Sequence, residues 1–293
     1  MTQDVDLVVF RGKFFLVSFL ARRKLTRVDF IVGGVQKAGT TALHDFLAQH
    51  PHVALLRDQA LHFFDKEENF GPRCGPHGRS TGGPSRTGVS APNYDILHRN
   101  FDPPRHWKIA GEVTADYLYY PRALERIAAY NPAMKLVVSL RNPVDRAFSQ
   151  WNMRHAKGRE ALPFIDAIKC DVETGVHRAP RGNAYIARSL YSAQLERVFD
   201  LFPRHNVLVL KYEDLRHKPE EIVRQLFDFL GLEFRKVKNK HRNVGIYSRE
   251  MTPKEREFVS GFFEDDIPKV EALLGWDCSD WRATVAPRAA LSR

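Results

Sequence analysis

The sequence predicts an α/β fold: a P-loop-like central parallel sheet flanked by helices on both faces, in a single domain. Three observations support this prediction. Short apolar runs recur along the chain, each run is followed by a helical pattern, and the first run leads into a glycine-rich loop. Continuous apolar runs are typical of parallel strands that are buried on both faces, and their alternation with helices favours this architecture.

Three strand–helix pairs are predicted in chain order, namely 29–32 with 41–49, 135–140 with 144–157, and 206–210 with 219–230. In open parallel sheets, ligands bind beyond the carboxyl ends of the strands. We therefore expect the chemistry of this protein to lie at these three strand ends.

The chain ahead of the first strand, residues 1–28, is predicted to be an N-terminal extension packed on a domain that covers 29–293. Its apolar run at 14–20 is too short to span a bilayer, and no small-residue cleavage site follows it. We interpret this run as a docked amphipathic helix, with peripheral membrane contact as the alternative. No stable membrane insertion is expected.

Residues 71–93 have the composition of a loop, rich in Gly, Pro, Ser and Arg and almost without apolar side chains. This composition predicts a flexible loop within the domain. A tolerated surface insertion and a functional lid or substrate loop are both open.

Composition narrows the class of protein. Of 293 residues, 43% are apolar and 27% are charged. This composition is sufficient for a hydrophobic core and excludes a disordered or fibrous chain. Lys and Arg number 45 against 35 acidic residues, and this net charge of +10 favours anionic partners. The three cysteines lie far apart, which excludes a disulfide framework and favours a reducing, cytoplasmic location.

The first strand leads into a candidate phosphate loop at 33–41, Gly-Gly-Val-Gln-Lys-Ala-Gly-Thr-Thr. Glycines allow a close backbone approach to an anion, and the following helix presents free N–H groups. A Walker A loop needs a lysine directly after its second glycine, and Thr40 stands there instead. The lysine of this loop, Lys37, precedes Gly39 by two residues. This shift indicates a different anion from a nucleoside triphosphate and weakens the case for a metal.

Three segments together carry a family resemblance: 34–43, His50-Pro51, and the run His62-Phe63-Phe64-Asp65. They resemble the family of sulfotransferases that use 3′-phosphoadenosine 5′-phosphosulfate (PAPS), above all the heparan-sulfate type and its bacterial relatives. The resemblance implies transfer of a sulfuryl group to a hydroxyl, less often an amine, of a small-molecule or glycan-like acceptor. The product is the 3′,5′-bisphosphate PAP, and no metal is required.

The same resemblance assigns the phosphate loop to the 5′-phosphosulfate. Lys37 contacts the bridging oxygen in the family, which gives it the role of general acid or electrostatic clamp. The implied cofactor-binding residues of the loop are Gly34, Gln36, Lys37, Ala38, Gly39, Thr40 and Thr41.

A second anion site follows the second predicted strand, where residues 141–149 read R-N-P-x-x-R-x-x-S. An arginine offers a planar donor fork for phosphate, and a serine adds a hydroxyl. This pattern is similar to the 3′-phosphate site of the family, so the resemblance implies that Arg141 and Ser149 bind the 3′-phosphate. Arg146 is interpreted as a surface residue in a salt bridge and is left out of the site.

Further matches extend to about residue 281. The segment 188–191 resembles a family region that supplies Tyr191 to the cofactor and Arg188 to the substrate, and 211–215 resembles a shared structural segment. The basic stretch 236–249 stands where a family loop closes over PAPS, with a solvated basic loop as the alternative. Its implied cofactor residues are Lys240, Arg242, Asn243 and Gly245.

The expected catalytic base is missing. Heparan-type relatives carry a glutamate two residues before the histidine of the H-F-F run, and that position holds Ala60 here. Three explanations are open: Ala60 is an inactivating replacement, another residue is the base, or the protein binds PAPS without turning it over. His62 is the first alternative base because its ordinary pKa suits the task; Glu112 and Asp65 follow. His62 and Asp65 are also expected to contact the substrate, unless His62 is a core histidine bonded to the backbone.

The segment 111–117, Gly-Glu-Val-Thr-Ala-Asp-Tyr, is similar to another family motif. Glu112 matches, whereas Val113 replaces a lysine of heparan-type members and Ala115 replaces a proline. The lost lysine argues against a heparan-like acidic substrate. Glu112 orients Lys37 or a substrate hydroxyl, or else forms a structural ion pair.

Two other classes of function remain as alternatives. A P-loop small-molecule kinase using ATP and Mg²⁺ is disfavoured by the shifted Lys37 and by a second phosphate site that ATP would not fill. A non-catalytic module that binds PAPS, another nucleotide or nucleic acid fits the positive charge and Ala60. No nucleic-acid motif is present, so no nucleic-acid partner is expected. The protein is expected to be a monomer or a homodimer.

Overall fold

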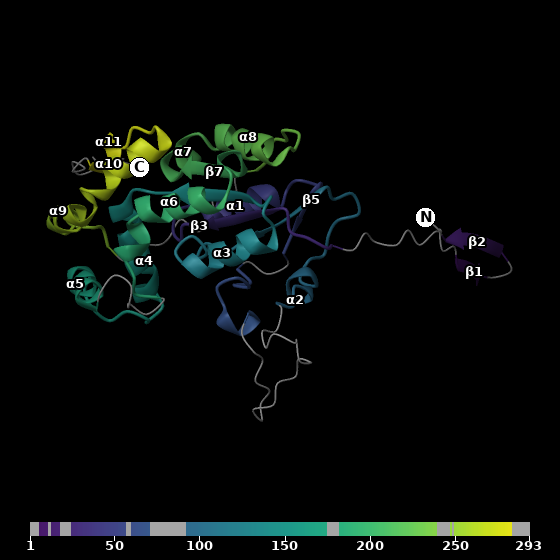
Figure 1. Ribbon diagram of the computed structural model, residues 1–293, viewed down its shortest axis with the longest axis horizontal. Helices are drawn as coiled ribbons and strands as arrows, with labels where there is room; N and C mark the ends of the chain where they lie inside the picture. Colours follow the sequence, from purple (N-terminus) through teal and green to yellow (C-terminus); the bar gives the residue numbers. More distant parts are fainter. Residues whose placement is uncertain are drawn as a thin grey trace, which may run out of the picture.

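The computed structural model describes residues 6–10, 13–17, 25–56, 60–70, 92–174, 182–238, 247 and 249–282, the first two ranges by their backbone alone. Figure 1 shows a central sheet with helices packed around it. Its five parallel strands have the order β4-β5-β3-β6-β7. The strands are β3 (Phe30–Gly34), β4 (Val53–Leu55), β5 (Ile109–Val113), β6 (Lys135–Leu140) and β7 (Val207–Lys211). Three of them confirm the strands expected from the apolar runs.

Helices cover both faces of this sheet, because successive strand residues point to opposite sides. Phe30 and Val32 of β3 pack in one apolar cluster with α1 (Thr40–Leu47) and α8 (Pro219–Leu230). Ile31, between them, packs in the other cluster. That cluster contains residues of α3 (Pro121–Tyr130), α4 (Pro143–Ala156) and α6 (Ser192–Leu201). The predicted single α/β domain with helices on both faces is confirmed.

Proline and glycine mark several helix ends. Helices α3, α4, α8 and α9 (Pro253–Ser260) all begin with proline, whose fixed φ suits the first helical turn. Helix α8 ends at Gly231, which has the left-handed φ of 74°. The other described helices are α2 (Asp95–His98), α5 (Phe164–Thr174), α7 (Tyr212–His217), α10 (Asp266–Leu274) and α11 (Ser279–Arg282). Single 3₁₀ turns lie at Glu67–Asn69, Ala187–Ser189, Arg204–Asn206 and Gly261–Phe263.

Two strands of the sheet were not expected from the sequence, β4 and β5. Strand β4 has only three residues, and β5 carries Gly111 and Glu112 at its centre. Gly111 is needed because the ring of Phe30 lies over it: a Cβ there would stand 2.1 Å from Phe30 Cζ. A glycine and a carboxylate weaken the apolar pattern that identifies a buried strand.

The N-terminal region differs from its predicted helix. Asp6–Phe10 (β1) and Lys13–Val17 (β2) pair as an antiparallel two-stranded sheet, so the expectation of an amphipathic helix at 14–20 was wrong. Apolar runs of this length fit either structure by periodicity, and here the pairing with β1 decides it. Leu25 and Val28 are buried in the core of the domain. The packing of the rest of residues 1–28 stays a prediction, and residues 71–91 lie outside the described chain.

Candidate active site

The carboxyl ends of three adjacent strands form one site. Strand β3 leads into the phosphate loop, β5 into Thr114–Asp116, and β6 into Arg141. This is the edge at which parallel sheets bind their ligands, and the three segments come from distant parts of the chain.

The shape of the phosphate loop depends on Gly39. It has a φ of 83° directly before α1, and a Cβ at this position would lie 2.6 Å from Leu215 Cδ2. Both its backbone conformation and its close neighbour therefore require glycine. Helix α1 has no acidic residue in its first turn and no side-chain cap among the described residues, so its N-terminal N–H groups can bind an anion.

Strand β6 holds the loop from the side. Ser139 Oγ donates to the carbonyl of Ala38 at 2.7 Å, and Arg141 Nη1 donates to the carbonyl of Lys37 at 3.0 Å. The N–H of Val35 donates to the carbonyl of Ser139 at 2.9 Å. The predicted 5′ site and the predicted 3′ site are thus joined by direct hydrogen bonds.

Lys37 stands in a positive field. Burial lowers the pKa of its ammonium, and the nearby charges of Arg141, Lys157 and Arg146 lower it further. These cations together favour a bound anion. A lysine with a lowered pKa also gives up its proton more readily to a leaving phosphate.

Arg141 is fixed by residues from two other segments. Its guanidinium lies over the ring of Tyr212, 4.8 Å from the centroid, and its carbonyl accepts a hydrogen bond from Tyr191 Oη at 2.8 Å. Glu213 Oε1 accepts from the N–H of Asn142 at 3.0 Å. Because the side chain of Tyr191 is fully buried, we expect it to act on the cofactor site through Arg141. Ser149 lies within α4 and is also buried.

Arg146 differs from its interpretation as a surface residue. It is fully buried, and it donates to Ser189 Oγ, to Gln150 Oε1 at 2.7 Å and to the carbonyl of Tyr185 at 2.6 Å. Burial lowers its pKa to about 10. Neutral oxygens satisfy this charge, and together they attach the 185–189 segment to α4.

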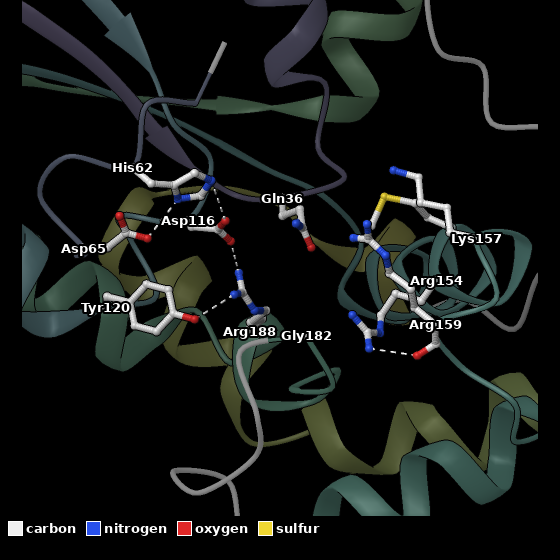
Figure 2. A pocket seen from close by; sticks show the side chains of 11 residues that line it. Gln36, His62, Asp65, Asp116, Tyr120, Arg154, Lys157, Arg159, Gly182 and Arg188 are labelled. Atoms are coloured by element: carbon white, nitrogen blue, oxygen red, sulfur yellow. Dashed lines mark hydrogen bonds and ion pairs between the residues drawn. The ribbon is translucent and has the colours of Figure 1, made fainter. Parts of the chain in front are cut away.

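His62 lies between two carboxylates (Figure 2). Its Nδ1 is 2.9 Å from Asp65 Oδ2, and its Nε2 is 3.8 Å from Asp116 Oδ2. The hydrogen bond that His62 donates to Asp65 raises the pKa of the imidazole, burial opposes this, and the charges of Asp65 and Asp116 raise it again. Since a carboxylate only accepts, the proton of the neutral ring lies on Nδ1 and Nε2 carries the lone pair. His62 is therefore not a core histidine bonded to the backbone.

The position of the absent glutamate is adjacent. Ala60 donates its N–H to the carbonyl of Val113 at 3.1 Å, at the end of β5. Ala60 and His62 both have a left-handed φ, 62° and 55°. Residues other than glycine rarely adopt this backbone conformation, and those that do cluster at functional sites.

Glu112 supports the His62 segment from the interior. It is fully buried and accepts hydrogen bonds from Tyr117 Oη and, at 2.8 Å, from Thr114 Oγ1. The same Tyr117 oxygen accepts from the N–H groups of Phe63 and Phe64 at 3.0 and 3.3 Å. Burial raises the pKa of Glu112 to about 7. Its partners are these neutral hydroxyls, and the described contacts do not include Lys37 or an ion-pair partner.

A cavity of about 200 Å³ opens in front of His62 (Figure 2). In Figure 2, His62, Asp65, Asp116, Tyr120 and Arg188 form one wall and Arg154, Lys157 and Arg159 form the other, with Gln36 between them. Met153 and Gly182 also line the cavity. Arg188 lines the cavity, and its guanidinium is bonded to Asp116 and Tyr120. The sequence analysis did not single out Asp116, Arg154, Lys157 or Arg159. Arg154 lies in α4, the helix that follows Arg141, and Lys157 caps its C-terminal end. This was the one available signal.

Some predicted residues cannot be placed. Lys240, Arg242, Asn243 and Gly245 lie outside the described residues. Among the residues that are described, no cluster of three or more His, Cys, Asp or Glu side chains is arranged to hold a metal ion. Within the same residues, no helix is both long and apolar enough to cross a membrane.

The fold and the site define a class: an α/β protein in which a P-loop-like turn, with N–H donors and cationic side chains, lies near a histidine–aspartate pair. Comparison with known families identifies this class. The Sulfotransferase domain family matches residues 27–260, and the chain belongs to this family.

Individual relatives agree with this assignment. Human heparan sulfate glucosamine 3-O-sulfotransferase 6 is 31% identical over 226 residues, which cover 77% of this chain and 58% of that protein. The chain thus spans little more than half the length of this relative. A sulfotransferase structure from Alicyclobacillus acidocaldarius is 32% identical, with a TM-score of 0.73 over 88% of this chain and all of that one. A mouse sulfotransferase solved with PAP shares the fold, with a TM-score of 0.50 and 13% identity over 92% of this chain and 99% of that one.

Proposed function

We propose that this protein transfers a sulfuryl group from PAPS to a hydroxyl of a small-molecule or glycan-like acceptor and releases PAP. One observation carries the proposal. Two cationic sites, at the ends of adjacent strands β3 and β6, are joined by the hydrogen bond from Arg141 to Lys37, and a histidine–aspartate pair lies at the neighbouring end of β5. A nucleotide with a phosphate at one end and a phosphosulfate at the other matches this arrangement.

The residues present fit this cofactor. Gly39 allows the left-handed turn that ends the loop, the start of α1 offers N–H donors, and Lys37 and Arg141 supply positive charge. Bound there, PAPS supplies the sulfuryl group together with a phosphate leaving group. Gly34, Gln36, Ala38, Thr40 and Thr41 would surround the 5′ end, and Arg141 and Ser149 would hold the 3′-phosphate.

Different side chains of this protein carry out different parts of the transfer. The ammonium of Lys37 stabilises the negative charge that develops on the departing phosphate. Nε2 of His62 accepts the proton of the acceptor hydroxyl, and Asp65 keeps the imidazole in the tautomer that can accept it. The walls of the cavity orient the acceptor. This orientation speeds the transfer because it fixes the geometry of attack.

The cavity limits the acceptor. Its volume of about 200 Å³ lies below the roughly 300–1,000 Å³ of typical ligand pockets. It therefore holds the reacting unit of an acceptor, such as one sugar ring, and its charged and polar lining suits a hydroxylated molecule.

The first test is calorimetric titration with PAP, beside ATP with Mg²⁺. Tight binding of PAP with little response to ATP supports the cofactor assignment. Preference for ATP with Mg²⁺ would overturn it in favour of a kinase. An affinity for PAP that falls steeply as the salt concentration rises would indicate a general electrostatic patch.

Replacing Arg141 by alanine is expected to weaken PAP far more than adenosine 5′-phosphate. Hydrogen bonds to charged groups contribute about 1.5–3 kcal/mol, so PAP affinity should fall roughly 10- to 150-fold. Calorimetry of both ligands measures the difference. Arg224→Ala, on the half-exposed surface of α8, is the matched control and should leave both affinities unchanged. Equal losses for the two ligands in Arg141→Ala would assign Arg141 a structural role only.

Replacing Ala60 by glutamate tests the absent base. With His62 as the base, Ala60→Glu is expected to leave PAPS turnover within a few-fold, because the His62–Asp65 pair already provides proton acceptance. Release of PAP from PAPS measures turnover, and Ala60→Gln controls for the added bulk. A rise of tenfold or more in Ala60→Glu alone would instead show that Ala60 is an inactivating replacement.

A further inference from the structure

We infer that Asp116 is a positioning residue of the acceptor site, held by Arg188 against Nε2 of His62, and that it brings to this pocket the carboxylate that residue 60 lacks. The inference deepens the proposed function and rests on it. Asp116 follows β5 in the chain, whereas Ala60 lies in the segment after β4, so the charge reaches the cavity from a different strand end.

Asp116 is held in one orientation by a buried arginine. Its Oδ1 is bonded to Arg188 Nη1, and Arg188 Nη2 donates to Tyr120 Oη at 3.2 Å. The same guanidinium lies over the ring of Tyr119, 4.5 Å from the centroid. Arg188 is only 4% exposed, so packing and hydrogen bonds fix the pair as a unit.

The second oxygen of Asp116 faces the histidine. Asp116 Oδ2 is 3.8 Å from His62 Nε2, beyond the roughly 2.7–3.2 Å of a direct hydrogen bond. Both residues line the cavity, and Figure 2 shows the aspartate beside the open edge of the ring. The gap leaves Nε2 free to accept the proton of an acceptor hydroxyl.

The role follows from the charge that forms during transfer. When Nε2 takes the acceptor proton, the ring becomes an imidazolium with a carboxylate at each nitrogen, Asp65 at Nδ1 and Asp116 near Nε2. This second charge matters because the opposite wall is cationic. The charged groups around His62 are Asp65, Lys66, Glu112 and Asp116 on its own side, with Arg188, Arg154, Lys157 and Arg159 lining the same cavity.

The direct test is the titration of His62, followed by NMR of its imidazole in the full chain with PAP present, and assigned by the signal lost in His62→Gln. In Asp116→Asn, the pKa of His62 is expected to fall by roughly 0.5–1 unit, because a negative charge has been removed and Arg188 is left uncompensated. Asp116→Glu should restore the original value. Asp200→Asn, an exposed aspartate on α6, is the matched control.

Each outcome decides the inference. A lower His62 pKa in Asp116→Asn with unchanged PAP affinity supports it, and an unchanged pKa overturns it. If Asp116→Asn fails to fold, Asp116→Glu and Asp116→Ala give the same comparison between a charged and an uncharged side chain. A wild-type chain that neither binds PAP nor releases it from PAPS would contradict the proposed function, whereas the titration would still decide whether Asp116 acts on His62.

Discussion

Replacing Lys37 by alanine is expected to reduce sulfuryl transfer by about 10²–10³-fold, the loss typical when one preorganised charge donor is removed from a reaction centre. Lys37 stands on the loop that Ser139 and Arg141 hold in place. Under the proposed function, its ammonium meets the charge on the departing phosphate. PAP affinity should fall only modestly, because Arg141 and the start of α1 remain. Release of PAP from PAPS gives the rate, and calorimetry gives the affinity.

The control for this prediction is Lys157→Ala. Lys157 contributes to the same positive field and lines the cavity, but it lies on the opposite wall from His62. Its loss should lower the rate less than tenfold. A Lys37→Ala protein that transfers at the wild-type rate would remove the clamp role from Lys37.

Replacing His62 by asparagine is expected to lower transfer by about 10²–10⁴-fold, the usual contribution of a positioned general base. Asparagine occupies a similar volume but cannot accept the proton. The pH profile should change as well. The hydrogen bond that His62 donates to Asp65 raises the pKa of His62, so the wild-type rate should fall as pH decreases through a value above the ordinary pKa of about 6.5. This acidic limb should be absent in His62→Asn.

His205→Asn, an exposed histidine, is the control and should retain both the rate and the limb. If His62→Asn kept the acidic limb with its midpoint unchanged, another group would be the base. Glu112, whose pKa is raised to about 7, would then be the next residue to replace.

Much of the sheet could be predicted because its signals are local. Strands β3, β6 and β7 are apolar runs that a helix follows, and their burial on both faces gives each a continuous apolar sequence. Strand β5 lacks this signal because Gly111 makes room for the ring of Phe30, a requirement that only the assembled sheet reveals. For β2, the run itself was visible, but its partner strand determined its conformation.

The candidate site, too, could be predicted only in part from the sequence. Lys37 and Arg141 stand at fixed offsets after predicted strands, so the chain order alone places them at one edge of the sheet. The partnership of Asp116 with Arg188 joins residues 72 positions apart, and no spacing rule indicates it. The buried position of Arg146 was likewise invisible, because a lone arginine on a helix usually faces solvent.

Arg141 has a further consequence for selectivity. Its guanidinium is already bonded to the carbonyl of Lys37, and under the proposed assignment the same rigid fork also meets the 3′-phosphate. A ligand whose 3′-phosphate displaces the guanidinium of Arg141 also displaces the phosphate loop, because the guanidinium is bonded to the carbonyl of Lys37. The site therefore responds to the spacing between two negative charges in its ligand rather than to their number. Among bisphosphates of equal charge, only those whose two phosphates are as far apart as in PAP are expected to leave Lys37 in place.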